Sequence, residues 1–258
     1  MTDQREPLLY AVSGAVARLT LNRPGKRNAL NAALVGALSG ALERAERDAS
    51  VKVVEITGAG ADFCAGADLS ELRDLAASSV EANLADVDAL ASVFLQIRTL
   101  GKPVVAVVQG RALAGGCGLA TACDLVVAAR SATFGYPEVH IGFVPAMVMA
   151  ILRRNVSEKR AFELITLGET FAAPQAERLG LVNRVFDDES FAEDAAAFST
   201  ALAERSGTAI LLAKRLLYEQ DSMGFEAAIR AGADVNVLAR MTDDARAGVA
   251  RFLNRRDS

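Results

Sequence analysis

The sequence predicts an α/β fold, because short apolar strands alternate with helical patterns along most of its 258 residues. Three runs rich in valine and other apolar residues, at 51–57, 103–109 and 124–129, are typical of strands buried on both faces. Turns, loops and amphipathic segments separate these runs. Hydrophobic residues make up 52% of the chain, which is ample for a buried core.

The first elements expected are a hairpin and a helix. Residues 8–21 alternate apolar and polar side chains on either side of Ser13-Gly14, a pattern that favours two strands joined by a tight turn. A four-residue spacing then predicts an amphipathic helix that turns its leucines inward. The residues with this spacing are Leu30, Leu34, Leu38 and Leu42.

The last quarter of the chain is predicted to be helical. Strand patterns stop near residue 192, and helical stretches follow at 192–205, 207–220 and 224–240, with a fourth from Thr242. Thr242 is a favourable N-cap, since two aspartates follow it at the positive end of the helix. We therefore divide the chain into a core at 1–191 and a helical region at 192–258.

Composition excludes several classes of protein. A net charge of −4 argues against nucleic-acid binding as the main activity, because phosphate neutralisation needs a concentrated basic face. No apolar run approaches the roughly 20 residues that span a bilayer, and no secretory signal is visible at the N-terminus; a cytoplasmic location is expected. Three cysteines without a C-x-x-C pair argue against a disulfide framework or a metal site.

A glycine-rich turn carries the clearest chemical signal. The strand at 103–109 leads into LAGGCGLA at 113–120, where glycines allow a ligand to approach backbone N–H groups at the start of a helix. A second loop, DFCAGADL at 62–69, follows the strand at 51–57. N–H groups from two such loops can converge on one oxygen and stabilise an enolate or a tetrahedral oxyanion.

One carboxylate, Glu138, follows the glycine turn and could move protons beside that oxygen. Other interpretations are weaker. A dinucleotide site would need a third glycine where Thr121 stands. A cysteine hydrolase would use Cys117 with His140, the only histidine, which would share a face with Glu138 in an extended segment. Close helix packing alone could also explain the glycines.

Four segments in order carry a family resemblance: NRPGKRNAL at 22–30, FCAGADL at 63–69, GKPVVAVVQGRALAGGCGLATACDLVVAA at 101–129 and FGYPEVHIGFVP at 134–145. They resemble the crotonase, or enoyl-CoA hydratase/isomerase, superfamily. The resemblance implies a ββα spiral core, a helical trimerisation region, and trimers that often pair into hexamers. It also implies an acyl-CoA thioester substrate, with no metal, flavin or nicotinamide cofactor.

The same resemblance implies site residues. The thioester oxygen would lie between the N–H groups of Ala65 and Gly115, and Glu138 would be the catalytic acid–base. Arg255 and Arg256 are further candidates for phosphate contacts. The residues expected along the substrate and its CoA are Lys26, Arg27, Ala29, Ala65, Gly66, Ala67, Asp68, Leu69 and Gly115.

Two departures from the family pattern stand out. Well-known hydratases carry a second glutamate where this chain has Gly118, and usually a glycine where it has Ala146. With Glu138 alone, the chain fits an enoyl-CoA hydratase that adds water across the 2,3 double bond through an enolate. It also fits a Δ3,Δ2-enoyl-CoA isomerase, in which one base suffices. A noncatalytic acyl-CoA-binding relative is a third interpretation.

Overall fold

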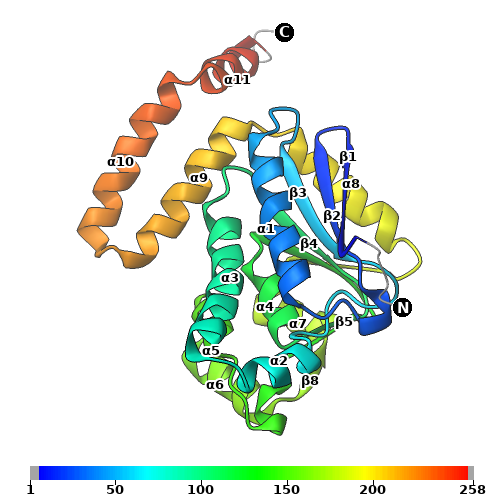
Figure 1. The fold of residues 1–258 in the computed structure, drawn as a ribbon. Coiled ribbons are helices and arrows are strands. Elements are labelled where there is room, and N and C mark those ends of the chain that lie inside the picture. Colours follow the sequence, from blue (N-terminus) through cyan, green and yellow to red (C-terminus); the bar gives the residue numbers. More distant parts are fainter. Residues whose placement is uncertain (1–5, 255–258) are drawn as a thin grey trace.

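The computed structural model describes residues 6–254, and a six-stranded sheet lies at its centre (Figure 1). The strand order is β1-β2-β3-β4-β6-β9, and every neighbouring pair after the β1–β2 hairpin is parallel. The strands are β1 (Leu8–Ser13), β2 (Val16–Leu21), β3 (Val53–Gly58), β4 (Val104–Val108), β6 (Leu125–Ala129) and β9 (Arg184–Phe186). The predicted hairpin and the three apolar strands are thus confirmed.

A smaller sheet has the strand order β5-β7-β8. Its strands are β5 (Arg111–Leu113), β7 (Thr133–Gly135) and β8 (Thr170–Ala172). The β5 strand ends directly before α4 (Gly115–Ala122), whose first residue is the first glycine of the turn. The turn and the helix follow as the sequence predicts, but a short strand that was not predicted, β5, lies between β4 and the turn.

Helices cover the sheets. They are η1 (Pro24–Lys26), α1 (Ala32–Arg47), α2 (Leu69–Ala76), α3 (Val80–Thr99), η2 (Pro137–Ile141), α5 (Ala146–Asn155), α6 (Glu158–Leu167) and α7 (Ala173–Leu179). Helix α1 turns its leucines inward as expected but begins after Leu30, because the Asn31 side chain caps it by accepting from the Leu34 N–H at 3.0 Å. Leu30 instead forms a β-bridge with Ala67.

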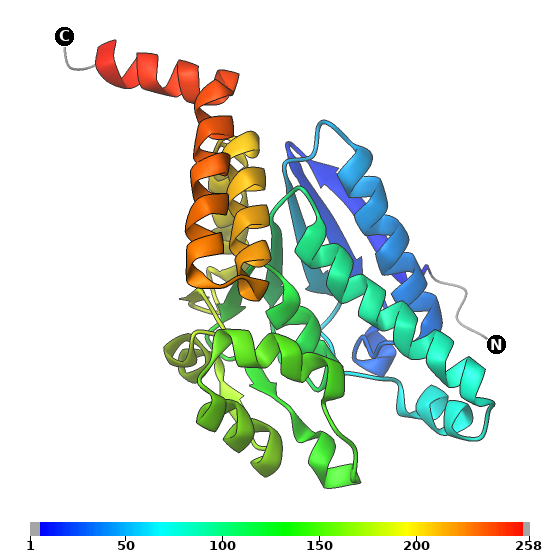
Figure 2. The same cartoon turned by 90° about the vertical axis from the view of Figure 1, so that its left-hand side faces the viewer.

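The C-terminal region is helical as predicted. It comprises α8 (Phe191–Ala203), α9 (Gly207–Glu219), η3 (Gln220–Ser222), α10 (Phe225–Met241) and α11 (Asp243–Asn254). Helix α8 packs against β2 and β3, whereas α10 and α11 extend away from the core (Figures 1 and 2). Thr242 caps α11, since its Oγ1 accepts from the Ala245 N–H at 3.2 Å. The division of the chain at residue 191 stays a prediction.

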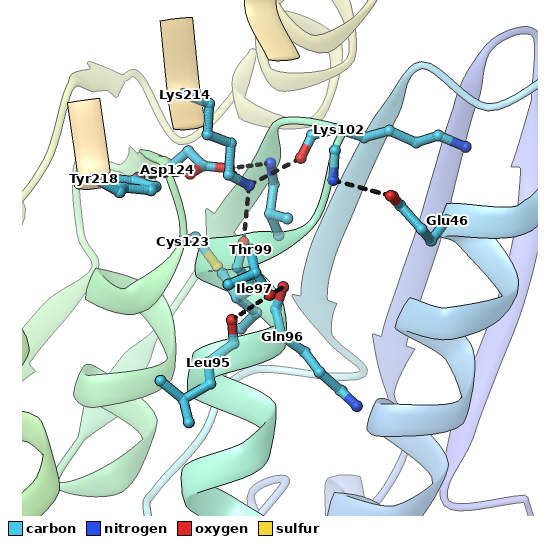
Figure 3. A network of polar contacts seen from close by, with 12 residues as sticks. Glu46, Leu95, Gln96, Ile97, Thr99, Lys102, Cys123, Asp124, Lys214 and Tyr218 are labelled. Carbon is cyan, nitrogen blue, oxygen red and sulfur yellow. Dashed lines mark hydrogen bonds and ion pairs between the residues drawn. The ribbon is translucent and has the colours of Figure 1, made fainter. Parts of the chain in front are cut away.

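A buried ion pair fastens α9 to the core (Figure 3). Lys214 donates to Asp124 Oδ2 at 2.7 Å and to the carbonyls of Ile97 and Lys102 at 2.8 and 3.0 Å. The Tyr218 hydroxyl donates to the other oxygen of Asp124 at 2.6 Å. Because burial outweighs the attraction of Asp124, the pKa of Lys214 is lowered. This network joins α9 to the end of α3 and to the sheet.

All three cysteines, Cys64, Cys117 and Cys123, are buried and free, as expected of core thiols. Across residues 6–254, no helix combines the length and the apolar character needed to cross a membrane.

Candidate active site

A cavity of about 330 Å³ opens where the two glycine-containing loops meet. Most of its walls are apolar and come from α2, α3, η2, α5 and the two loops. Its lining comprises Ala65, Ala67, Leu69, Leu72, Leu90, Phe94, Ala114, Gly115, Pro137, Glu138, His140, Ile141, Phe143, Val144, Pro145, Ala146, Met147 and Val148. Glu138 is the one carboxylate among these residues, which all lie in the described part of the chain.

The two loops are held side by side by backbone hydrogen bonds. The Leu113 N–H donates to the Cys64 carbonyl at 3.0 Å, and the Cys64 N–H donates to the Arg111 carbonyl at 3.0 Å. Gly66 has a φ of 97°, and a Cβ there would lie 2.7 Å from the Ala114 Cβ. Only glycine therefore allows this close approach.

The prediction that Ala65 supplies an oxyanion donor is wrong. Its N–H already donates to the Arg27 carbonyl at 3.0 Å, so it holds the loop in place and is not available to a ligand. The Ala67 N–H, by contrast, has no hydrogen-bond partner within residues 6–254. Because Ala67 lines the cavity, its N–H replaces that of Ala65 as the candidate donor.

Gly115 supplies the second free N–H. It is the first residue of α4, and N–H groups at that position have no acceptor within the helix. The Gly115 N–H also has no hydrogen-bond acceptor elsewhere in the described chain. A Cβ built on Gly115 would lie 4.0 Å from the Ala67 nitrogen. The N–H groups of Ala67 and Gly115 thus lie beside each other at the cavity wall.

The residue before Gly115 has a strained backbone. Ala114 adopts a φ of 50° and a ψ of −127°, a region that L-residues rarely occupy. Its N–H donates to the Gly135 carbonyl at 2.9 Å. This conformation sets the direction of the following peptide, which carries the Gly115 N–H.

Glu138 lies in η2, is 8% exposed and lines the cavity. Its Oε2 atom is buried without a hydrogen-bond partner in the described structure. Burial raises the pKa of Glu138 above its ordinary value, because the charged form is poorly solvated. A carboxylate in this state is suited to accept and return a proton.

Val148 accounts for the missing second glutamate. A Cβ built on Gly118 would lie 1.9 Å from the Val148 Cγ1 and 3.0 Å from its Cβ. The valine, which is 4% exposed, therefore occupies the space that a side chain at position 118 would require. The site is built for one carboxylate.

The predicted CoA residues fall into two groups. Lys26, Arg27 and Leu69 are exposed near the cavity loops, where a ligand could reach them, and their contacts with CoA stay a prediction. Asp68 and Ala29 are buried instead. The Asp68 carboxylate accepts from the Ser70 hydroxyl, from Arg23 at 2.8 Å and from the Ser70 N–H at 3.1 Å, which lowers its pKa to about 2. Arg255 and Arg256 lie outside the described residues.

The interpretations involving His140 and Cys117 are not supported. The segment is a 3-10 helix and not extended as expected, although His140 and Glu138 both line the cavity. The His140 Nε2 atom lies 3.2 Å from the Gly168 carbonyl oxygen. Cys117 is fully buried, and burial raises its pKa to about 12. A thiol that holds its proton so firmly is a poor nucleophile.

Free N–H groups and a desolvated carboxylate that line one cavity are typical of enzymes that stabilise an oxyanion and transfer protons. Residues 11–258 match the family described as Enoyl-CoA hydratase/isomerase. The chain belongs to this family, and the predicted superfamily and fold are confirmed.

Individual relatives are similar in sequence or structure to this chain over nearly its whole length. A Thermus thermophilus protein whose name assigns it to the enoyl-CoA hydratases is 41% identical, covering 96% of this chain and 98% of its own. The 2,3-dehydroadipyl-CoA hydratase of Escherichia coli is 37% identical, with 96% of each chain covered. The crystal structure of a Mycobacterium smegmatis enoyl-CoA hydratase has a TM-score of 0.93 at 35% identity, with 97% of each chain covered.

Three features of the site escaped the sequence reasoning. The Ala67 N–H is free because the loop's backbone hydrogen bonds use the N–H of Ala65 and not that of Ala67. The strain at Ala114 and the contact between Val148 and Gly118 depend on backbone positions far apart in the chain. No local sequence signal marks the strain, because alanine does not favour a positive φ.

Proposed function

We propose that the protein is an enoyl-CoA hydratase that adds water across the 2,3 double bond of an enoyl-CoA thioester. The observation that carries the proposal is the pairing of a buried, unpartnered Glu138 oxygen with the free N–H groups of Ala67 and Gly115 in one cavity. Membership of the family and the hydratase names of several relatives support the same activity.

In the proposed reaction, the thioester oxygen accepts hydrogen bonds from the N–H groups of Ala67 and Gly115. The Glu138 carboxylate takes a proton from water while the water oxygen bonds to C3, and the electrons of the double bond move to the thioester oxygen as an enolate. Glu138 then returns the proton to C2, the enolate collapses, and one water molecule has been added. Donors aimed at the developing negative charge typically contribute several kcal/mol.

The first test is hydration of crotonyl-CoA by purified protein. Loss of the conjugated thioester absorbance together with formation of 3-hydroxybutyryl-CoA would support the proposal. If 2-enoyl-CoA and 3-enoyl-CoA thioesters of several chain lengths all remain unchanged while acyl-CoA still binds, the protein is a noncatalytic relative.

A second candidate function is double-bond isomerisation from position 3 to position 2. The observation that favours it is that Glu138 is the one carboxylate lining the cavity, because an isomerase needs a single base to take a proton from C2 and return it at C4. The same two N–H groups would hold the dienolate. Conversion of a 3-enoyl-CoA to the 2-enoyl isomer, without hydration, would favour this function.

Binding of the CoA portion, assembly and location belong to the same proposal. We expect exposed Lys26 and Arg27 to lie along the CoA.

Trimers or hexamers are expected through the C-terminal helices, which expose Phe225, Ile229 and Phe252 at 84%, 61% and 64%. The thioester and the N–H groups already supply activation, so the reaction needs no metal or cofactor. A cytoplasmic role in fatty acid metabolism fits this chemistry.

A further inference from the structure

A second cavity continues the active-site cavity between two helices. It has a volume of about 400 Å³ and is lined by residues of α3 and α5. Phe94 and Met147 line both cavities, so the two cavities are adjacent at these side chains. The remaining lining is Ala91, Leu95, Arg98, Ala150, Ile151 and Arg154.

The second cavity is apolar along its length and basic at one end. Leu95, Ile151 and the two shared residues can contact an alkyl chain, whereas Arg98 and Arg154 are its two charged residues. Both arginines donate to the same oxygen of Asp221, Arg154 through its Nε at 2.8 Å. Two guanidinium groups facing one carboxylate leave a local charge of about +1 and unused N–H donors.

The positions of the arginines suit a ligand that enters from the active site. Arg154 lies seven residues beyond Met147, about 10 Å along a helix axis. Its Nη1 donates to the Ala150 carbonyl at 2.7 Å, so the guanidinium lies back over the preceding turn, towards Met147. A chain extending several carbons past the reacting double bond would therefore reach the basic end.

From this arrangement, and resting on the proposed acyl-CoA function, we infer that the preferred substrates are medium-chain enoyl-CoA thioesters whose acyl chain ends in a carboxylate. The alkyl part lies between α3 and α5, past Phe94 and Met147. The terminal carboxylate binds Arg98 and Arg154 in the place that Asp221 now partly fills. A bidentate guanidinium fits a carboxylate well, whereas a methyl end would leave these charges without a ligand partner.

Binding of unreactive saturated thioesters tests this inference independently of turnover. Titration calorimetry would compare hexanoyl-CoA with adipyl-CoA and decanoyl-CoA with sebacyl-CoA, pairs that differ only at the chain end. We expect the carboxylate-ended member of at least one pair to bind about tenfold more tightly or better. Equal or weaker binding of the carboxylate-ended member in both pairs would overturn the inference. Because no reaction is needed, that result would leave the hydratase proposal standing.

Two variants separate ligand recognition from a purely structural role. Arg154→Met keeps the apolar stem and should abolish the preference for the carboxylate-ended chain, while Arg153→Met, an exposed neighbour outside both cavities, should keep it. Asp221→Asn removes the competing carboxylate and should strengthen the preference. If Arg154→Met and Asp221→Asn change the affinity of both members of each pair equally, the arginines only join helices and the inference fails.

Discussion

Val148 fills the space beside Gly118: a Cβ on residue 118 would lie 1.9 Å from the Val148 Cγ1. The family resemblance predicts a glutamate at position 118, but here Val148 of helix α5 fills that space. The absence of a second carboxylate is therefore built into the packing of α4 against α5. It is not a change that one substitution can reverse.

This packing predicts the behaviour of a double variant. Gly118→Glu alone should destabilise the protein by more than about 3 kcal/mol, since a buried side chain would overlap Val148. Combining it with Val148→Gly removes the clash and should restore folding and raise the hydration rate with crotonyl-CoA above that of Val148→Gly alone. Denaturant unfolding and steady-state kinetics on all three variants check this. A single Gly118→Glu variant as stable as the parent would contradict it.

Glu138 should control the rate and its dependence on pH. Glu138→Gln keeps the size of the side chain but removes the base, so turnover should fall by at least about a hundredfold while acyl-CoA binding persists. Since burial raises the Glu138 pKa, kcat/KM should fall as the pH is lowered, at a higher pH than for an exposed glutamate. If turnover is unaffected by Glu138→Gln, Glu138 is not the catalytic base.

The Gly115 N–H can be removed with little change to the helix. Proline is tolerated at the first position of a helix, so Gly115→Pro should fold and reduce kcat by about 10² to 10³. Gly115→Ala is the matched control, because its Cβ would meet its nearest neighbour, Leu30 Cδ1, at an ordinary 3.6 Å and the N–H would remain. Stopped-flow or steady-state kinetics on both variants separate loss of the donor from added bulk. Equal losses would mean that the N–H itself is not used.

The Ala114→Gly variant should be more stable than the parent protein. With its φ of 50° and ψ of −127°, the alanine carries strain of about 1 to 3 kcal/mol that glycine does not have. Ala114→Gly is expected to raise the free energy of unfolding by about 1 kcal/mol, after allowing for the greater entropy of unfolded glycine. Ala213→Gly, at an exposed position inside α9, should instead lower it by about 1 kcal/mol. Urea unfolding of both variants measures these opposite signs.

The buried ion pair of α9 predicts a large loss of stability. Lys214→Met leaves the Asp124 carboxylate with hydrogen bonds from Tyr218 and the Val104 N–H but no cation, so stability should fall by about 3 kcal/mol. Arg215→Met, on an exposed position of the same helix, should change stability by less than about 0.5 kcal/mol. Similar effects in both variants would show that the network in Figure 3 contributes little.

Several parts of the fold could be predicted because they depend on local sequence. The hairpin around Gly14 follows from alternation and a residue that accepts positive φ, and the cap at Thr242 from a side chain close to the N–H that it binds. Helix α1 shows the limit: the leucine spacing includes Leu30, but the helix starts later, because Leu30 pairs with Ala67 on another loop.

The family, the turn and helix that begin at Gly115, and the choice of Glu138 as the acid could all be predicted, because each depends on a contiguous motif. Tertiary structure decided which loop N–H is free, because the Ala65 N–H is bonded to Arg27, 38 positions earlier in the chain. It also decided that Val148 closes the space at Gly118 and that Arg98, Arg154 and Asp221 meet at one end of a cavity. Such contacts join residues distant in sequence, and only the packing of helices and loops brings them together.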